Sequence, residues 1–376
     1  MRLLVVSHTG LRSGAEIVLE RIVDAAVRGG WDVTALTPPG PTAESLTAAG
    51  AAVLRLPDLT LSRGHRGRAA LGLLGRNGRA VPAVRRAARD ADVVLVNGLL
   101  GLPSVAAAHL DVPVVWLVHD VVSRLDRRVV IRLGGRSLRC AVAVSEVAAG
   151  PVRAMGIPVV VIPAGTPYPV RPRPDELVEP VVVGCAAALT PWKGQDVLLE
   201  AFAIVARRTN ATLELLGSPY PRDACYAEDL RARADAGDLR GRVRFLGYQS
   251  DPGAIVRRWT VAVSASVEPE AVGLATLEAM SLGVPVVGTD LGATHHVLGD
   301  AGLLVKAGDA AGLARAVLRL IEDSDQWARC HQAGPPRVDE QFRLDRQLEL
   351  TLALLAEIGR TQTSPVAEHH RERRPA

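Results

Sequence analysis

The chain has 376 residues, 48% of them hydrophobic, which suits two globular domains with sizeable cores. No segment reaches the roughly 20 uninterrupted apolar residues of a membrane-spanning helix, and the first apolar run is too short for a secretion signal, so a cytoplasmic protein is expected. The net charge is only +4, and the four cysteines have no C-x-x-C spacing, so the sequence predicts neither a disulfide framework nor a zinc site.

The first part of the chain alternates short β-branched runs with helical stretches. Continuous apolar runs spaced by helices indicate strands that are buried on both faces, hence a parallel sheet. The predicted strands are 3–7, 32–36, 52–56, 92–96, 113–119, 141–145 and 159–162. We therefore expect a Rossmann-like domain over residues 1–165, in which ligands bind at the carboxyl ends of the strands.

This half of the chain is also its basic half. Residues 1–165 carry 20 lysines and arginines against 12 acidic residues, whereas the remainder carries 24 against 28. Much of the excess lies in segments 62–90 and 123–140, which have almost no aromatic residues for base stacking. We expect no nucleic-acid partner, and we keep open an anionic acceptor, a membrane surface or an ordinary solvated face.

A linker and a second domain follow. Residues 163–180 hold six prolines, as an extended linker would. The α/β pattern then restarts, with strands predicted at 181–187, 212–217, 242–247, 261–266, 284–289 and 302–305, and helices near 194–208, 223–236, 251–258, 273–282 and 309–322. We expect a second Rossmann-like domain over 166–337, a helix over 338–360 that packs back on the first domain, and a disordered tail over 361–376.

Lysine is rare enough to be informative. Only Lys193 and Lys306 occur among 44 basic residues, and Lys193 lies between the first strand and first helix of the second domain. A compact ammonium group ahead of a helix suits a phosphate contact, reinforced by the amides of the helix N-terminus. Survival of two lysines by chance is the alternative.

Two glutamates, Glu270 and Glu278, flank a predicted helix start at Gly273 in the stretch PEAVGLATLEAMSLGVPVV. Partial positive charge at a helix N-terminus favours phosphate, and carboxylates accept hydrogen bonds from sugar hydroxyls. One nucleotide sugar could therefore contact all three positions. Solvated glutamates beside a helix dipole are the alternative.

In combination, these motifs resemble the retaining glycosyltransferases of family 4 (group 1). The resemblance covers about residues 2–355 and rests on E-x7-E followed by EAMSLGVPVV, on WKGQDVLLEAF, on FLGY, on SGAE, and on WLVHD. It implies the α/β GT-B fold, two facing Rossmann-like domains with a central cleft, the first binding the acceptor and the second the nucleotide sugar.

The resemblance also implies roles for individual residues. His119 and Glu270 would be the catalytic residues, both beside the donor sugar. Lys193 would bind the diphosphate, and Glu278 the ribose hydroxyls. The remaining donor-binding positions would be Gly14 in the glycine-rich loop, Gly247 at the nucleobase, and Gly273 and Leu274 at the helix start. Without the resemblance, His119 would be read as a core histidine.

Three positions depart from the family pattern. Ala188 replaces an arginine that usually shares the diphosphate, His296 replaces a glutamate, and Ala164 replaces a hinge asparagine. Loss of a charged phosphate partner costs about 1.5 to 3 kcal/mol. The sequence predicts no metal site and no cofactor, because helix dipoles and Lys193 could stabilise the leaving diphosphate.

The expected function is retaining transfer of a hexose from a nucleotide diphosphate sugar, with a UDP- or GDP-sugar preferred, to an acceptor hydroxyl in bacterial glycan, glycolipid or secondary-metabolite synthesis. A peripheral position at the inner membrane face is kept beside the cytoplasmic location. The alternatives are a nucleotide-sugar epimerase or hydrolase and a non-catalytic partner subunit. A nicotinamide enzyme is disfavoured because neither domain opens with G-x-G-x-x-G.

Overall fold

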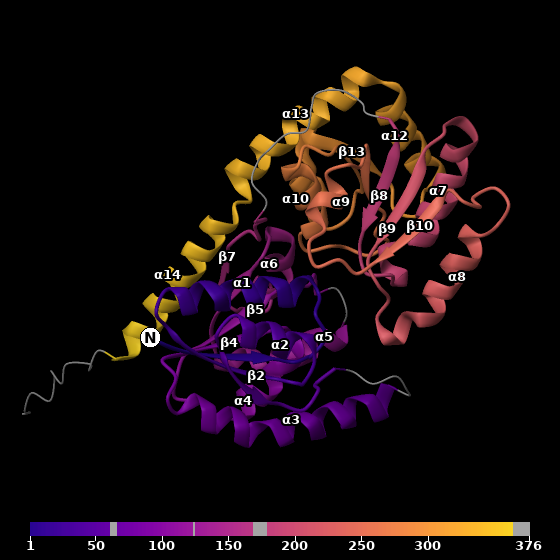
Figure 1. The fold of residues 1–376 in the computed structure, drawn as a ribbon. Coiled ribbons are helices and arrows are strands. Elements are labelled where there is room, and N and C mark those ends of the chain that lie inside the picture. Colours follow the sequence, from indigo (N-terminus) through magenta and orange to yellow (C-terminus); the bar gives the residue numbers. More distant parts are fainter. Residues whose placement is uncertain (61–65, 123–124, 168–178, 364–376) are drawn as a thin grey trace, which may run out of the picture. The chain divides into compact units, whose positions relative to one another are not determined.

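The computed structural model describes residues 1–60, 66–122, 125–167 and 179–363. The chain forms two compact α/β units (Figure 1). One unit contains Met1–Ala143, Pro151–Val160 and the chain from Leu348 onward, and the other contains Val144–Gly150 and Val161–Gln347. The domain limits expected from the sequence stay predictions.

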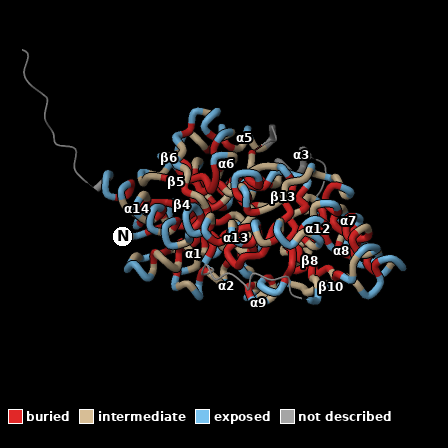
Figure 2. The backbone as a smooth tube through the Cα atoms, turned by 90° about the horizontal axis from the view of Figure 1, so that it is seen from above, coloured by how far each residue is buried: buried red, intermediate tan, exposed pale blue. Residues whose placement is uncertain are grey.

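The first unit is built on a seven-stranded sheet in the order β3-β2-β1-β4-β5-β6-β7. Its strands are β1 (Arg2–Ser7), β2 (Asp32–Thr37), β3 (Ala52–Arg55), β4 (Val93–Asn97), β5 (Val114–Val118), β6 (Leu138–Ala143) and β7 (Val159–Val161). Neighbouring strands from β3 to β6 are parallel. The central strands are buried almost throughout (Figure 2), as their unbroken apolar runs predict.

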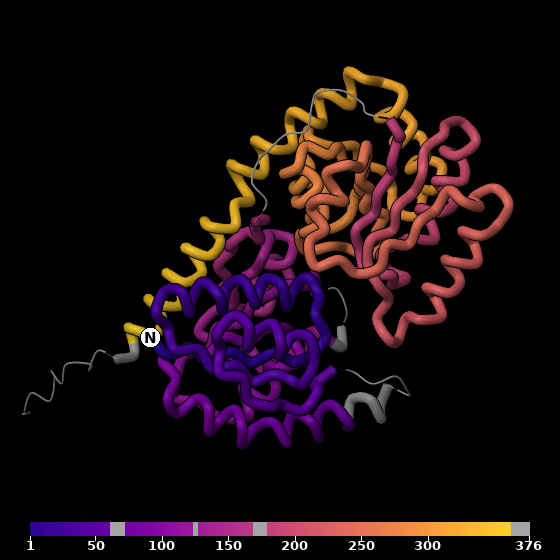
Figure 3. The backbone as a smooth tube through the Cα atoms, viewed as in Figure 1, coloured from indigo at the N-terminus to yellow at the C-terminus, as the bar shows by residue number. Residues whose placement is uncertain are grey.

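Helices connect these strands, and the last helix of the chain returns to them. The helices are α1 (Gly14–Arg28), α2 (Pro41–Ala48), α3 (Arg66–Ala88), α4 (Leu102–Ala107), α5 (Leu125–Gly134), α6 (Glu146–Arg153) and α14 (Leu344–Thr363), with short 3-10 turns at Leu99–Gly101 and Gly135–Ser137. Figure 3 shows the yellow end of α14 beside the point marked N. A Cβ added to Gly359 of α14 would be 2.6 Å from the Met1 methyl group. The C-terminal part of α14 therefore belongs to the first unit.

The second unit is built on a six-stranded parallel sheet in the order β10-β9-β8-β11-β12-β13. Its strands are β8 (Val182–Ala186), β9 (Thr212–Leu216), β10 (Val243–Gly247), β11 (Val261–Ser264), β12 (Val286–Thr289) and β13 (Gly302–Val305). Its helices are α7 (Gln195–Arg208), α8 (Ala224–Ala234), α9 (Gly253–Val256), α10 (Leu274–Ser281), α11 (Thr294–Leu298), α12 (Ala310–Glu322) and α13 (Ser324–Gln341), with 3-10 turns at Pro191–Lys193, Pro221–Asp223 and Gly299–Ala301.

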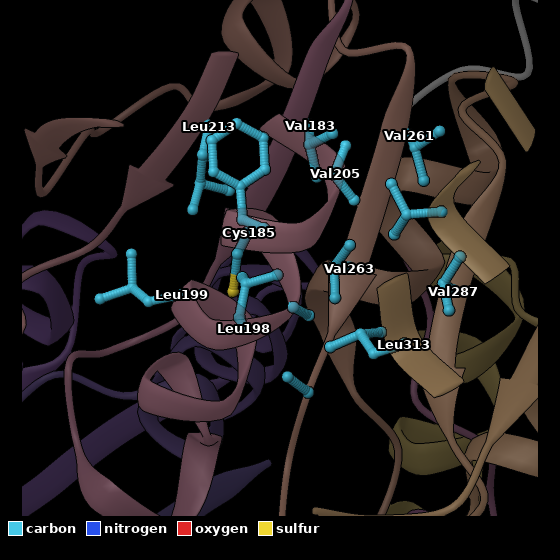
Figure 4. Packing of buried hydrophobic residues seen from close by; sticks show 14 of the residues in the cluster. Val183, Cys185, Leu198, Leu199, Val205, Leu213, Val261, Val263, Val287 and Leu313 are labelled. Carbon is cyan, nitrogen blue, oxygen red and sulfur yellow. The ribbon is translucent and has the colours of Figure 1, made fainter. Parts of the chain in front are cut away.

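In both sheets the strand order reverses beside the first strand, between β1 and β4 and again between β8 and β11. This is the switch point at which doubly wound sheets bind ligands. In the second unit, apolar side chains of the four strands β8, β9, β11 and β12 pack against the helices α7 and α12. Figure 4 shows part of this cluster, including Val183, Val263 and Leu198, each at most 4% exposed. The core fixes the loops at the carboxyl ends of the strands.

All thirteen predicted strands are present, but β6 begins and ends earlier than expected. Ser145, expected to end the strand, instead caps α6, since its Oγ accepts from the Ala148 amide at 3.2 Å. The sequence pattern also missed α11 and α13. The expected single helix over 338–360 is divided at Phe342, whose carbonyl accepts from the Thr166 amide at 3.0 Å. This hydrogen bond joins two segments that are far apart in the sequence, and it lies between the end of α13 and the start of α14.

Some expectations concern residues outside the described ones. Most of the proline-rich linker, residues 168–178, and most of the expected tail, residues 364–376, lie there. The first residues assigned to the tail are helical, because α14 continues to Thr363. Among the helices of the described ranges, none is long and apolar enough to cross a membrane.

Candidate functional site

A lysine and a glutamate meet at the switch point of the second sheet. Lys193 ends the 3-10 turn after β8, and Glu270 lies in the loop after the adjacent strand β11. The Lys193 Nζ and a Glu270 carboxylate oxygen are 2.9 Å apart, and the two side chains are 18% and 8% exposed. Lys193 and Glu270, the two residues of this unit that the sequence indicates most strongly as functional, therefore form a direct ion pair.

Further contacts hold Glu270 in its ionised form. Ser266 Oγ donates to the same carboxylate oxygen, and Ser264 Oγ lies 3.4 Å from it. Burial by itself would raise the pKa of Glu270, but the Lys193 charge and these hydroxyl donors outweigh it, and the pKa lies below its ordinary value. Ser264 ends β11 and Ser266 lies two residues farther along the extended chain, so their side chains point to the same face.

The backbone around Lys193 is held close to the next strand's loop. Gly194 has φ +66°, and a Cβ added there would lie 2.1 Å from the Ala265 carbonyl oxygen. The Val267 amide donates to the Trp192 carbonyl at 2.9 Å. Lys193 Nζ also lies 4.0 Å from the centroid of the Trp192 ring, a cation–π distance. Only glycine at 194 permits this approach.

We expect Gly194→Ala to lower the free energy of unfolding by about 1 to 2 kcal/mol through left-handed strain and by about 1 to 3 kcal/mol more through overpacking. Gly308→Ala is the matched control, because Gly308 has φ +76° but open space around its Cβ position. The difference between the two losses, measured by denaturant unfolding, is the cost of the contact between the added Cβ and the Ala265 carbonyl oxygen. Equal losses in the two variants would show that this contact does not restrict residue 194.

A helix begins after Gly273, as the sequence predicts. Gly273 has φ +79° at the N-cap of α10, and an added Cβ would lie 3.3 Å from a Glu270 carboxylate oxygen. Leu274 is the first residue of α10, and Glu278 lies partly buried in its second turn. Glu270 thus lies beside the N-terminal end of α10, and Glu278 lies farther along the helix.

A loop from the next strand fixes the Glu270 backbone. Gly292, after β12, has φ +62°, and an added Cβ would lie 2.2 Å from the Glu270 carbonyl oxygen. The Ala293 amide donates to that oxygen at 2.8 Å. His296, at the departed family position, is exposed, and its ring is 6.1 Å from the Phe342 ring. Gly292 therefore permits the close approach to the Glu270 backbone, while the His296 ring lies against the C-terminal end of α13.

The loop after β8 is ordered without the family's arginine. The carbonyl of Ala188 accepts from the Gln195 side-chain amide at 2.8 Å, and Gln195 is fully buried. At the end of β10, the Gly247 carbonyl accepts from the Gly217 amide at 2.9 Å, with φ +66° at Gly247. Ala164, the third departure, is 1% exposed. These contacts shape the carboxyl edge but add no cation beside Lys193.

The first unit has its own polar network at its switch point. His119 follows β5, and its Nε2 lies 2.8 Å from the Asn97 side-chain oxygen. The Asn97 amide donates to Glu16 at 3.3 Å, and Glu16 forms a capping box with Ser13 at the start of α1. Gly14 is the exposed first residue of α1. The glycine-rich segment and His119 therefore belong to one network through Asn97.

The His119 ring is neutral at ordinary pH. Burial lowers its pKa to about 4; Asp120 raises the pKa and His8 lowers it, both by smaller amounts. The unfolded chain, with an ordinary pKa of 6.5, then binds more protons than the fold between these values. His119 therefore stabilises the fold fully above pH 6.5, and that contribution falls as the pH decreases toward 4.

We expect a His119→Gln variant to lose less stability than the unchanged chain on acidification between pH 6.5 and 4. Urea unfolding at several pH values measures the difference between the two profiles. Parallel profiles would show that His119 titrates alike in the folded and unfolded chain. His295→Gln is the control, because His295 is an exposed side chain.

Among the residues that the structure describes, no group of three or more His, Cys, Asp or Glu side chains is arranged to hold a metal ion. Within the second unit, the sequence-predicted residues Lys193, Glu270 and Gly273 come together. Sequence reasoning missed the direct ion pair, its serine donors and Asn97. The spacing of Ser264 and Ser266 was a signal for the donors, whereas nothing local indicated Asn97.

Comparison with known proteins identifies relatives of both units. Residues 179–323 match the family described as glycosyl transferases group 1, and residues 13–165 match the glycosyl transferase 4-like domain. The phosphatidyl-myo-inositol mannosyltransferase of Mycolicibacterium smegmatis is 36% identical over 35% of this chain and 34% of its own length. The lipopolysaccharide core biosynthesis glycosyltransferase LpsE of Rhizobium meliloti is 33% identical over 50% and 53%, respectively.

These alignments span about a third to a half of the curated relatives' own length. A solved structure extends the likeness of fold to nearly the whole chain. Anabaena Alr3699/HepE, solved in complex with UDP and glucose, has a TM-score of 0.80 and 23% identity, covering 95% of this chain and 99% of its own. At that identity, the likeness shows the fold alone, which is the expected GT-B fold.

Proposed function

Because the chain belongs to the group 1, or family 4, glycosyltransferases, we propose that it transfers a hexose from a nucleotide diphosphate sugar to an acceptor hydroxyl with retention of the anomeric configuration. The observation that carries the proposal is the Lys193–Glu270 pair at the switch point, beside the N-terminus of α10. A UDP- or GDP-sugar is the proposed donor.

Each group has a role in this proposal. Lys193 and the α10 N-terminus would stabilise the leaving diphosphate, where negative charge develops. Glu270 would accept hydrogen bonds from the donor sugar, and Glu278 from the ribose. His119 would orient the donor sugar. We propose no metal requirement, so activity is expected to persist in a chelator.

A thermal-shift screen with UDP-, GDP-, ADP- and dTDP-sugars tests the proposal first. Free ligand at about 100 times its Kd stabilises a protein by about 2.7 kcal/mol, so a bound donor will raise the Tm. A transfer assay with the stabilising donor, and NMR of the product's anomeric proton, then tests reaction and retention. Donor consumption without acceptor would instead indicate an epimerase or hydrolase.

A non-catalytic partner subunit is the second candidate, favoured by Ala188 at the position of the usual arginine. A glycosyltransferase must bind a nucleotide diphosphate, whereas such a subunit need not. Absence of binding to all four nucleotide diphosphates by calorimetry would favour this candidate. Ala188→Arg is then expected to introduce measurable binding if only the missing cation is responsible.

We further propose an anionic or membrane-associated acceptor. The relatives' names refer to phosphatidyl-myo-inositol and lipopolysaccharide, and the first unit carries the basic excess. On α5, Val129 and Leu133 are 55% and 62% exposed beside the exposed Arg128 and Arg132. Apolar and basic side chains on one helix suit an anionic membrane surface. Cosedimentation with anionic but not neutral vesicles is the expected result, and no sedimentation would contradict it.

A further inference from the structure

Asn97 holds two histidines at once, at the end of β4 in the first unit. It is fully buried and ends the strand that pairs with β1 and β5. Its backbone oxygen lies 3.1 Å from His8 Nδ1, and its side-chain oxygen lies 2.8 Å from His119 Nε2. The two histidines follow the strands on either side of β4, so a single residue bridges them.

Each oxygen determines which ring nitrogen carries a proton. A backbone carbonyl can only accept, so His8 must hold its proton on Nδ1 to make the bond. Gly98 permits this contact, since an added Cβ would lie 2.5 Å from that nitrogen. In the neutral ring, His8 Nε2 is then an acceptor without a proton.

The Asn97 amide orientation follows from Glu16. The Asn97 Nδ2 faces a Glu16 carboxylate oxygen at 3.3 Å, and Glu16 is 2% exposed. Because Glu16 accepts from Ser13 through one oxygen and faces Asn97 through the other, the hydrogen-bond network places the amide nitrogen toward Glu16 and the amide oxygen toward His119. Since Ser13 donates its backbone N–H and its hydroxyl to the other Glu16 oxygen, the carboxylate itself is fixed by the start of α1.

We propose that Asn97 is a positioning residue that fixes His8 and His119 in complementary tautomers, so that His119 Nδ1 and His8 Nε2 are both hydrogen-bond acceptors for sugar hydroxyls. This rests on the proposed function for the identity of the ligand, but not for the tautomers. It adds His8 as a second histidine that would accept from the sugar. It also makes His119 an acceptor rather than a proton donor or a cation toward the sugar.

Among the residues that the structure describes, few titratable groups act on the His119 ring. His119 has Asp120 and His8 as its charged or titratable neighbours, and Glu16 is separated from it by the Asn97 amide. Asp120 is exposed, so water screens its charge more than it would a buried partner. The neutral, tautomer-fixed ring is therefore compatible with its surroundings.

The direct test is a long-range proton–nitrogen NMR spectrum of the chain labelled with ¹⁵N-histidine at pH 7. His8→Gln and His119→Gln assign the two signals. The expected result is a proton on Nε2 of His119 and on Nδ1 of His8. A charged His119, or a proton on its Nδ1, would overturn the proposal, and this readout needs neither activity nor a substituted Asn97.

Asn97→Ala removes the side-chain oxygen but keeps the backbone carbonyl. We expect His119 to lose its single tautomer while His8 keeps its own. Asn77→Ala is the matched control, because Asn77 is a buried asparagine of the same unit that bonds the Ser104 amide and the Leu73 carbonyl instead; it should change neither ring.

Kinetic measurements distinguish a positioning role of Asn97 from a purely structural role. Asn97→Ala should lower kcat/KM for transfer about tenfold, and should cause no further loss in a chain that already carries His119→Ala, because contacting residues are not additive. Additive losses would overturn the coupling. If no nucleotide sugar is turned over at all, the proposed function fails, while the tautomer result still decides the role of Asn97.

Discussion

Lys193→Ala is expected to lower kcat/KM for transfer by on the order of 10² to 10³-fold, because the group that meets the developing diphosphate charge is lost. The variant also leaves Glu270, 8% exposed, without its cationic partner. An uncompensated buried charge destabilises a fold by several kcal/mol, so the Tm should fall as well. Steady-state kinetics and thermal melts with and without the nucleotide measure both effects.

The sequence offers a matched control, since Lys306 is its only other lysine. Lys306 is exposed after β13, so Lys306→Ala removes the same chemical group away from Glu270. We expect neither kinetics nor Tm to change beyond experimental error. Unchanged turnover and nucleotide binding in Lys193→Ala would refute the donor-site assignment. Lys193→Arg should recover stability better than activity, because a planar guanidinium differs in shape from an ammonium group.

Glu270→Gln is expected to separate binding from transfer. The amide keeps the size of the side chain but removes the charge that neutralises Lys193, so a nucleotide diphosphate should bind at least as tightly as before. Transfer should nevertheless fall by on the order of 10²-fold, because the proposed acceptor for the sugar hydroxyls is weakened. Calorimetry with the nucleotide diphosphate and steady-state kinetics give the two values.

Glu278→Gln is the comparison, since it makes the same change on the neighbouring helix. If Glu278 binds ribose, that variant should weaken nucleotide binding instead. Weaker nucleotide binding and normal transfer in Glu270→Gln would reverse the two assignments. The contrast therefore tests which glutamate faces the sugar.

The pH dependence of folding gives an independent view of Glu270. Its pKa in the fold is below the ordinary value of 4.5, so the fold binds fewer protons there than the unfolded chain. Its stabilising contribution is present above pH 4.5 and is lost as the pH falls through the depressed value. Glu270→Gln should remove this part of the acid profile, as urea unfolding at successive pH values would reveal.

The fold was predictable because its signals are local. Short apolar and β-branched runs located all thirteen strands, and left-handed glycines such as Gly273 marked helix starts. The division of the last helix was not predictable, since it depends on Thr166 pairing with Phe342 across the sequence. Pro335 and Pro336 lie within α13, and proline is disfavoured inside a helix, so the local sequence does not indicate this helix.

The candidate site was predictable residue by residue but not as a set of contacts. A motif selected Lys193 and Glu270, yet their ion pair depends on β8 and β11 being neighbours. Asn97 carries no motif, and its role follows only from the placement of His8, Glu16 and His119 around it. Pairings between strands far apart in the sequence create these contacts, so no local pattern contains them.

The return of α14 to the first unit determines when this unit can complete its folding during synthesis on the ribosome. Leu355 and Ile358 are 0% and 7% exposed, and Gly359 lies against Met1 and Asp92. The strands of the first unit therefore await a helix that is translated only after the second unit. Until then, the surface under α14 is open to chaperones and to other nascent chains. A stop codon that removes α14 would thus leave its defect around Met1 and Asp92, more than 200 residues away from it in the sequence.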